Sequence, residues 1–493
     1  MTVVEDHAGT AAEPRSARAA ARGPRLSTVF TWVFAVGGLA VGIRPLHDNS
    51  FMWHLRTGRF ILDHGIPRQD PFSYTAAGTK WVAQSWLAEL VYGIVNRLTG
   101  AFGLRLLGAA LGLVVGAMLF RVALRCANDR IRAGALALLA FATLLNVWSE
   151  RPLMFGIVGM VLLVAIVELP ESRLGRHAMI ALPVLMWLWA NTHGTFVIGF
   201  GYLALHLVGR SCEGCSLRRG RERVLFRASL IAAAVTLVNP YGIDLVLFPL
   251  RLMARGEVLR DVAEWQSPNF REPGGMLFGA FLVCTLVVLA RKRPGVRDVL
   301  ITVAFVVLGL YAIRNVGLTA IAILPVLARL VRNDAPRADD RSSMHRLMVI
   351  AAACALVLGI VHAAGEPDWS LGAYPVKAFK AVQQQGLEGR RLFTTDAWGG
   401  YVIATAWPAQ KVFFDDRYDM YPIAVNRDYG TIANLEPGWA RMLDRYDVEV
   451  VMSPRKSVLV QALADRQEWV RVYGDDVAVV YARRTIVAAR TNA

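Results

Sequence analysis

The chain has 493 residues, of which 55% are hydrophobic and only 19% are charged, and its formal net charge is +16. Soluble globular proteins carry about 25% charged residues, so this composition excludes an ordinary soluble protein and indicates a chain surrounded mostly by lipid. The positive charge is carried mainly by arginines scattered between apolar runs, with no basic stripe interleaved with aromatic residues. We therefore predict a multi-pass protein of the cell (plasma) membrane that does not bind nucleic acid.

The N-terminal segment is rich in alanine and arginine and has no apolar run of its own. We interpret residues 1–26 as a disordered cytosolic tail. The apolar run at 27–43 begins further from the N-terminus than the hydrophobic region of a cleaved signal peptide, so it is predicted to be an uncleaved first span.

Membrane spans need about 17–25 mostly apolar residues. About eleven candidates occur, near 27–43, 101–120, 133–148, 153–169, 178–190, 195–210, 228–250, 275–290, 298–313, 316–331 and 347–364. Residues 82–98 are apolar on one face but carry Gln84 and Glu89, which favours an interfacial helix. The sequence thus predicts a polytopic α-helical transmembrane domain over 27–364, with an external loop at 44–100.

Basic residues predict the orientation of these spans. With a cytosolic N-terminus, the connections expected inside the cell carry arginine clusters, as at 121–132, 218–227 and 291–297. Short connections expected outside carry Arg151 or Arg314 alone, or no basic residue. This asymmetry follows the positive-inside rule. It places loop 44–100 and residues 365–493 outside the cytoplasm.

Residues 365–493 have a different pattern, in which strand candidates alternate with helix candidates. The strands are expected at 391–396, 411–415, 448–453, 469–473 and 477–482, and the helices at 375–385, 398–406, 421–445 and 456–467. This alternation predicts an extracytoplasmic α/β domain with a partly parallel sheet. Ligands of such sheets bind beyond the carboxyl ends of strands. We therefore predict that a ligand binds near the residues that follow two of the strands, namely Asp396, Trp398, Tyr401, Asp416 and Arg417.

Polar residues gather at the span ends that this topology places outside. They are Asp48, His54, Arg151, His193, Glu264, Trp265 and Arg314. Ionisable groups at membrane depth are costly and tend to mark function, so one shared cavity is predicted. The alternative for each cluster alone is that polar residues cap helix ends.

Asp48 is the candidate catalytic carboxylate, with His54 beside it, because an external carboxylate can act as a general base. Its alternative role is to cap a helix that begins near Asn49. Asp70 precedes Pro71 and is expected to serve a turn. His47, Asp48 and His54 are weak candidates for holding a divalent cation (Mg or Mn), because their spacing matches no strong metal motif.

Arg151 and Arg314 are each the single arginine of an outer connection, where a guanidinium can bind a phosphate or diphosphate. Their alternative role is to reach the lipid headgroups. His193 could pair with the same phosphate or bond a carbonyl at a helix end. Glu264 and Trp265 are placed with this substrate-binding group, and sugar rings can stack on the several outer tryptophans.

The order of these elements resembles a known family. A span, a long external loop with a carboxylate at its start, an interfacial helix, many spans and an external α/β domain together resemble the GT-C fold of polyprenyl-phosphate-sugar-dependent glycosyltransferases. The stretches "DNSFMWHLRTGRFILDHGIPRQDPFSYTAAGTKWVAQSWLAEL", "WANTHGTF", "NPYG", "EWQSP" and "DAWGGYVI…KVFFDDRYDMY" look like motifs of bacterial membrane proteins related to that fold. Asp48 matches the acidic residue of the first external loop, but Asn49 stands where the family often has a second acid.

The resemblance implies an inverting membrane glycosyltransferase. Such an enzyme moves a sugar from a polyprenyl-phosphate donor in the membrane lipid to a lipid, glycan or protein acceptor, with Asp48 as the base. The residues after the two strands, Asp396, Trp398, Tyr401, Asp416 and Arg417, would then lie on the acceptor side. Two alternatives stay open at this point. One is a transporter or flippase for a lipid-linked or anionic solute, which inverted repeats and polar residues at mid-span would favour. The other is a non-catalytic glycan-assembly scaffold, for which Asn49 is the best support.

Overall fold

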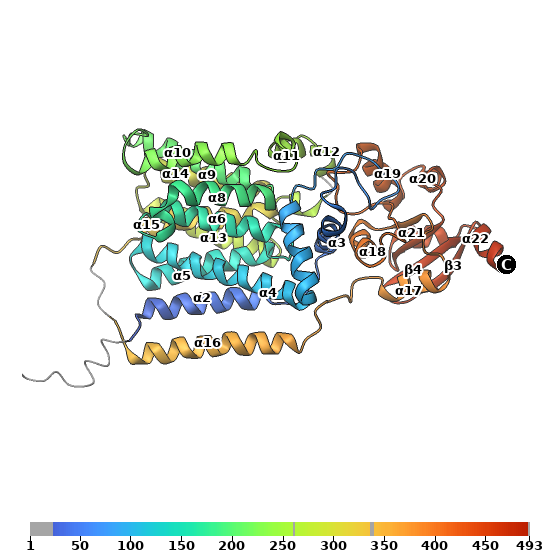
Figure 1. Cartoon of the computed structure of the whole chain (residues 1–493), viewed down its shortest axis with the longest axis horizontal. Helices are drawn as coiled ribbons and strands as arrows, with labels where there is room; N and C mark the ends of the chain where they lie inside the picture. Colours follow the sequence, from blue (N-terminus) through green and yellow to red (C-terminus); the bar gives the residue numbers. More distant parts are fainter. Residues whose placement is uncertain (1–22, 260–261, 336–339, 492–493) are drawn as a thin grey trace, which may run out of the picture.

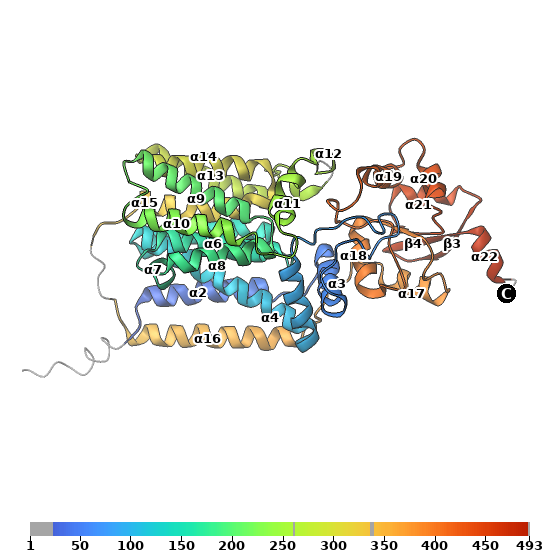
Figure 2. The ribbon, with the colours of Figure 1, turned by 45° about the horizontal axis from the view of Figure 1, so that its top comes forward.

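The computed structural model describes residues 23–259, 262–335 and 340–491, so most of the predicted tail 1–26 lies outside the described residues. A helical domain occupies one side of the molecule and a smaller domain with a sheet occupies the other (Figures 1 and 2). The long helices of the first domain are α2 (Leu26–Gly42), α4 (Trp86–Ala127), α5 (Arg130–Leu144), α6 (Leu153–Glu168), α8 (Ala178–Thr192), α9 (Phe196–Cys212), α10 (Gly220–Val235), α13 (Pro273–Arg291), α14 (Val296–Tyr311), α15 (Val316–Leu330) and α16 (Ser343–Ala364).

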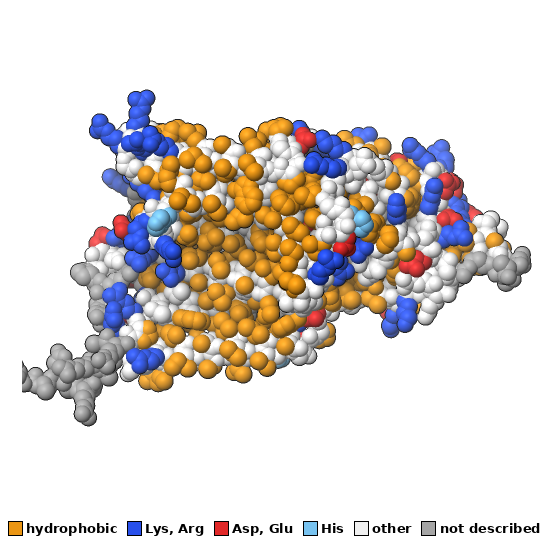
Figure 3. Space-filling model, in the orientation of Figure 1, with side chains coloured by type: hydrophobic (Ala, Val, Ile, Leu, Met, Phe, Trp, Pro, Cys, Tyr) orange, Lys and Arg blue, Asp and Glu red, His pale blue; other side chains and the backbone are white. Residues whose placement is uncertain are grey.

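Most side chains of these helices are apolar, and they face either one another or the outside of the bundle. Five helical segments are long and apolar enough to cross a membrane, and four shorter helices are apolar as well, within the described residues. The surface of the bundle is largely apolar, and Lys and Arg side chains gather at the end away from the second domain (Figure 3). This surface is that of a multi-pass membrane protein.

The predicted span at 228–250 is wrong. Helix α10 ends at Val235, and a separate short helix, α11, runs from Ile243 to Met253. Between them the side chain of Asn239 stabilises a turn, because it accepts from Tyr241 N at 2.8 Å and donates to Thr236 O at 2.9 Å. Pro240 follows Asn239 and has no N–H to continue a helix.

The predicted interfacial helix 82–98 is the first part of α4. A break at Gly100, with φ 69° and ψ −161°, separates this part from the rest of α4. Figures 1 and 2 show the first part running across the end of the bundle, beside α3 (Asn49–His64). Short elements complete this end and the connections: η1 (Leu145–Val147), α7 (Arg173–Arg176), α12 (Gly256–Leu259), η2 (Ala263–Trp265) and η3 (Ile313–Asn315).

The second domain has one sheet with the order β1-β2-β4-β3. Strands β1 (Leu392–Thr394) and β2 (Val450–Pro454) are parallel, whereas β4 (Ala478–Arg483) is antiparallel to β2 and to β3 (Trp469–Gly474), so the partly parallel sheet is confirmed. The helices are α17 (Val376–Gln384), α18 (Asp396–Ala406), α19 (Ile423–Ala433), α20 (Trp439–Arg445), α21 (Val458–Ala464) and α22 (Arg484–Thr491). The predicted helix 421–445 is thus two helices.

The predicted strand 411–415 forms only bridges. Val412 pairs with Leu392 of β1 on one side and, on the other, with Ser73 of the loop between α2 and α4. Loop residues such as Phe72 and Trp81 share one hydrophobic core with Phe413, Phe414 and their neighbours in the second domain. The loop between α2 and α4 is therefore built into the C-terminal domain.

Candidate functional site

A buried arginine holds the loop between α2 and α4 against the C-terminal domain. Arg417 is 1% exposed and donates to Asp70 Oδ1 at 2.8 Å, to Asp415 Oδ1 at 2.8 Å and to Asp415 Oδ2 at 2.6 Å. The rings of Trp81 and Phe72 lie 4.8 and 5.1 Å from the guanidinium carbon of Arg417. Truncating either partner of such an enclosed ion pair leaves an uncompensated charge. Arg417 thus fixes the position of the loop.

Asp70 has two roles, of which the sequence predicted one. Its carboxylate accepts from Phe72 N at 3.1 Å and from Ser73 N at 3.0 Å, which confirms the predicted turn. It also binds Arg417, far along the chain. Because the turn motif by itself accounts for an aspartate at this position, the ion pair with Arg417 could not be predicted from it.

Four charged side chains from separate segments form one chain of ion pairs, Asp48–Arg151–Glu264–Arg314. Arg151 Nε donates to Asp48 Oδ1 at 2.8 Å and to Oδ2 at 2.7 Å, and its Nη1 donates to Glu264 Oε2 at 2.9 Å. Arg314 Nη1 lies 3.3 Å from Glu264 Oε1. Asp48 also caps α3 by accepting from Phe51 N at 3.1 Å, so the predicted capping role is confirmed.

Trp265 and the two arginines set the electrostatics of this chain. The Trp265 ring lies 4.5 Å from the guanidinium carbon of Arg314. Burial raises the pKa of the Glu264 carboxyl, but the charges of Arg314 and Arg151 lower it by more, so Glu264 stays ionised. Both guanidiniums are therefore paired with carboxylates, and an anion that enters the site can compete with those carboxylates for the guanidiniums.

Two polar cavities meet at this chain of ion pairs. The first has a volume of about 160 Å³ and the second of about 440 Å³. Their shared wall consists of Ser50, Arg151, Leu153, Val262, Glu264, Arg314, Asp416 and Tyr418. Other side chains of the first cavity include His54, Trp81, Gln84, Glu89, His193 and Trp265, and those of the second include Asp48, Asn49, Asn146, Trp148 and Asp396. Most of the predicted site residues are therefore brought together.

A third cavity, of about 140 Å³, is mostly apolar and adjoins the first. His193, Trp265 and Arg314 line both cavities. Side chains of α9, α11 and α14 supply the apolar lining of the third cavity, among them Val197, Ile198, Pro249, Met253 and Leu308. A hydrocarbon chain in the third cavity would thus have its polar end at Arg314.

Both predicted histidines line the first cavity and are held by neighbours. His54 Nδ1 lies 2.7 Å from Glu89 Oε1, and His193 Nδ1 lies 2.9 Å from Thr195 Oγ1. Burial, followed by the charge of Arg151, lowers the pKa of His54 well below its ordinary value. His54 is therefore a neutral hydrogen-bonding group and not a cation.

Asp416 reaches the shared wall from the C-terminal domain. Its Oδ2 accepts from Asn49 Nδ2 at 2.6 Å and from Ser50 Oγ. Close backbone contact makes this possible, because a Cβ on Gly400 of α18 would lie 2.5 Å from Asn49 O. A Cβ on Gly399 would lie 2.4 Å from Phe414 O. Because neither glycine has a Cβ, α18 packs closely against the segment before Asp416 on one side and against the start of α3 on the other.

The remaining residues assigned to the acceptor side differ in their positions. Asp396 lines the second cavity, where its oxygens accept from Tyr418 OH at 2.7 Å and Tyr429 OH at 2.9 Å. Trp398 donates through Nε1 to Ala373 O at 3.0 Å, and Tyr401 packs in the domain core. The structure places these two side chains away from the three cavities described above.

Known proteins of similar structure decide the fold. No protein-family model matches the chain, and no curated protein matches its sequence. ArnT from Cupriavidus metallidurans bound to undecaprenyl phosphate is similar in structure, with a TM-score of 0.53 and 15% identity over 93% of this chain and 97% of that one. The chain has the GT-C fold. The oligosaccharyltransferase AglB from Archaeoglobus fulgidus, in complex with an inhibitory peptide and a dolichol-phosphate, has a TM-score of 0.51 and 11% identity over 86% of this chain and 69% of that one.

The side chains that the sequence suggested for a cation do not converge within this GT-C structure. His47 pairs with Glu150 at 3.1 Å, His54 with Glu89 at 2.7 Å, and Asp48 with Arg151. No group of three or more His, Cys, Asp or Glu side chains with metal-ligand geometry occurs among the described residues. The guanidinium of Arg151 instead lies between the carboxylates of Asp48 and Glu264. The donor set does not fit a divalent cation.

Sequence reasoning missed several partners in the site. Asn49 and Ser50 hold Asp416, Glu89 holds His54, and Asp415 neutralises Arg417. Glu89 carried a visible signal, because it is an acid within the apolar run 82–98. Asn49 carried none, since an asparagine at the start of a helix is ordinary.

Proposed function

We propose that this GT-C protein transfers a sugar from a polyprenyl-phosphate donor to a hydroxyl or amide of a lipid, glycan or protein acceptor outside the cytoplasm. One observation carries the proposal: Arg314 lies where a polar cavity meets an apolar one. A lipid phosphate has the same division, with a charged head and a hydrocarbon tail. ArnT bound to undecaprenyl phosphate and AglB in complex with dolichol-phosphate support this choice of ligand.

In this proposal the donor occupies two cavities. The phosphate-proximal end of its prenyl chain lies in the apolar cavity, and its phosphate binds Arg314 and Arg151 in place of part of their pairing with Glu264. Guanidinium groups suit this role because they bind phosphate oxygens in a bidentate manner. The sugar then lies in the first cavity, where Trp81 and Gln84 offer an apolar face and an amide. The acceptor enters the second cavity.

The reaction is a single displacement that inverts the anomeric carbon. The acceptor attacks from the side opposite the phosphate, and the bond between the anomeric carbon and the phosphate oxygen breaks with its electron pair going to the lipid phosphate. The two arginines stabilise the negative charge that grows on the phosphate. Asp48 binds Arg151 through both oxygens and so sets the orientation of that guanidinium. A carboxylate of the same site takes the acceptor proton.

The proposed orientation places the C-terminal domain outside the cytoplasm and the N-terminus inside. The clustering of Lys and Arg at the opposite end of the bundle supports it (Figure 3).

Lipid binding tests the proposed function. The purified full chain in nanodiscs is titrated with undecaprenyl phosphate and, as a matched probe, with undecaprenol, which lacks the phosphate. Wild-type protein should prefer the phosphate, and Arg314→Gln should weaken the affinity for undecaprenyl phosphate about 10-fold or more, because a charged hydrogen bond contributes about 1.5–3 kcal/mol.

Arg332→Gln is the matched control, because Arg332 is exposed, lies just after the other end of α15 and forms an ion pair with nearby Asp334. Its affinity should equal that of the wild type. Equal affinity of the wild type for both lipids would overturn the proposal. Movement of the lipid across proteoliposome membranes without a covalent product would favour a flippase instead.

A further inference from the structure

One carboxylate oxygen in the site has no hydrogen-bond partner. Asp416 Oδ1 is buried and unbonded among the described residues, whereas Oδ2 of the same side chain is held by Asn49 and Ser50. The residue belongs to the wall shared by the two polar cavities. An unpaired buried oxygen is costly unless something else uses it. Asp416 lies between the proposed places of the sugar and the acceptor, so its unpaired oxygen can take part in the reaction between them.

Asp416 is also held rigidly. Two donors from the start of α3 fix one oxygen, and the close seating of α18 on Asn49 fixes the backbone of α3 against the C-terminal domain. Catalytic groups need such support to keep their geometry. Asn49, at the start of α3, thus orients an acid that comes from the C-terminal domain.

We infer that Asp416 accepts the proton of the attacking hydroxyl through Oδ1, so that the C-terminal domain completes the catalytic site. This inference rests on the proposed glycosyl transfer. In the step, the O–H bond of the acceptor breaks and its proton moves to Asp416 Oδ1. The oxygen forms a bond to the anomeric carbon, and the bond from that carbon to the lipid phosphate breaks. No further reactant is needed.

Asp48 is less suited to this role. Both of its oxygens accept from Arg151, and Oδ1 accepts from Phe51 N as well. A proton arriving at Asp48 would compete with a guanidinium for the same lone pairs. Asp48 is therefore a positioning residue for Arg151, and Asp416 is the catalytic residue.

The surroundings of Asp416 also suit proton transfer near neutral pH. Burial raises its pKa to about 8, while the nearby charge of Arg151 and the hydrogen bond from Ser50 act in the opposite direction. The charged and titratable groups that act on it or line the same two cavities are Asp48, His54, Glu89, Arg151, His193, Glu264, Arg314, Asp396, Asp415, Arg417, Tyr418 and Asp419. A base must be unprotonated to act, so the transfer rate should rise with pH and level off above about pH 8.

The test compares Asp416→Asn and Asp416→Glu with wild type. Mass spectrometry of envelope lipids and glycans from cells with and without the gene identifies the sugar, and its polyprenyl-phosphate donor is then supplied to the protein in nanodiscs. Asp416→Asn should lower the transfer rate about 100-fold or more and abolish the rise with pH. Its affinity for undecaprenyl phosphate should stay within about 3-fold of wild type. Asp416→Glu should keep a rise with pH, at a reduced rate.

Asp476→Asn is the matched control, because Asp476 is a fully exposed acid on the β3–β4 turn of the same domain. It should leave both rate and affinity unchanged. Asp416→Asn with the wild-type rate and pH profile would overturn the inference and leave the proposed function standing. Loss of lipid binding in Asp416→Asn would also overturn it, since it would indicate a structural role. Cells without the gene that show no change in lipids or glycans would overturn the proposed function itself.

Discussion

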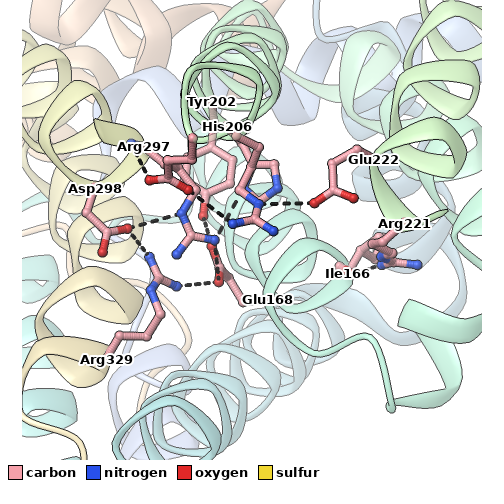
Figure 4. A network of polar contacts seen from close by, with 11 residues as sticks. Ile166, Glu168, Tyr202, His206, Arg221, Glu222, Arg297, Asp298 and Arg329 are labelled. Carbon is pink, nitrogen blue, oxygen red and sulfur yellow. Dashed lines mark hydrogen bonds and ion pairs between the residues drawn. The ribbon is translucent and has the colours of Figure 1, made fainter. Parts of the chain in front are cut away.

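The molecule encloses, fully or in part, two clusters of charged side chains at opposite ends of the same helices. The cluster beside the C-terminal domain, named the outer cluster, consists of Asp48, Arg151, Glu264 and Arg314, and the cluster at the other end, named the inner cluster, consists of Glu168, Arg297, Asp298 and Arg329. Arg151 precedes α6 and Glu168 ends it, while Arg297 and Asp298 begin α14 and Arg314 follows it. In the inner cluster, Arg329 of α15 bonds Glu168 and also donates to Asp298 Oδ1 at 2.7 Å, as Figure 4 shows. Tyr202 OH donates to Glu168 Oε1 at 3.0 Å. Both clusters therefore pair arginines with carboxylates.

The clusters differ in what surrounds the pairs. The carboxylates of the inner cluster are engaged by neighbouring helices, and its residues line none of the cavities described above. The outer cluster borders three cavities, and two acids beside it, Glu89 and Asp416, each keep one buried oxygen without a partner among the described residues. Buried charge alone thus does not mark a site. The combination of charge, space and an unpaired oxygen does.

The largest expected effect concerns activity at the outer cluster. Asp48→Asn should lower sugar transfer about 100-fold or more, because Arg151 loses the carboxylate that orients it. The fold should survive, since asparagine caps a helix as well as aspartate does. Transfer assays and thermal unfolding of the same preparation measure both effects. A large fall in Tm with normal transfer would make the outer cluster structural, like the inner one.

The second effect concerns stability at the inner cluster. Glu168→Gln removes one of the carboxylates that Arg329 and Arg297 share and leaves Asp298 to neutralise both arginines. Breaking a buried pair costs about 3 kcal/mol or more. Unfolding of the full chain in detergent should show a clear fall in Tm. Glu171→Gln, at an exposed acid three residues on, is the control. Unchanged stability, or loss of undecaprenyl phosphate binding by folded protein, would remove the distinction between the clusters.

The smallest expected effect is that of a chelator. Because Arg151 lies between Asp48 and Glu264, where a divalent cation would need to bind, EDTA should change the transfer rate by less than about 2-fold. The assay is repeated after adding back Mg²⁺ or Mn²⁺. Loss of transfer with EDTA and recovery with either ion would show that the two carboxylates turn from Arg151 toward a metal.

Local patterns in the sequence determined the helices, the basic end of the bundle and the alternation of strands and helices in the C-terminal domain. They determined these features because hydropathy, helix caps and turns depend on neighbours within a few residues. The same reasoning failed at 228–250, where the turn at Asn239 and Pro240 outweighs the apolar run on both sides.

Only the tertiary structure decided the composition of the site. Arg417 meets Asp70 and Asp416 meets Asn49 across separations of 347 and 367 residues. No local pattern specifies which of several acids will face a cavity, because that depends on which helix faces dock and how closely. Gly399 and Gly400 permit that docking. The sequence alone could therefore name Asp48 and Asp416 as candidates, whereas only the tertiary structure shows that Arg151 holds both oxygens of Asp48 and that one oxygen of Asp416 has no hydrogen-bond partner among the described residues.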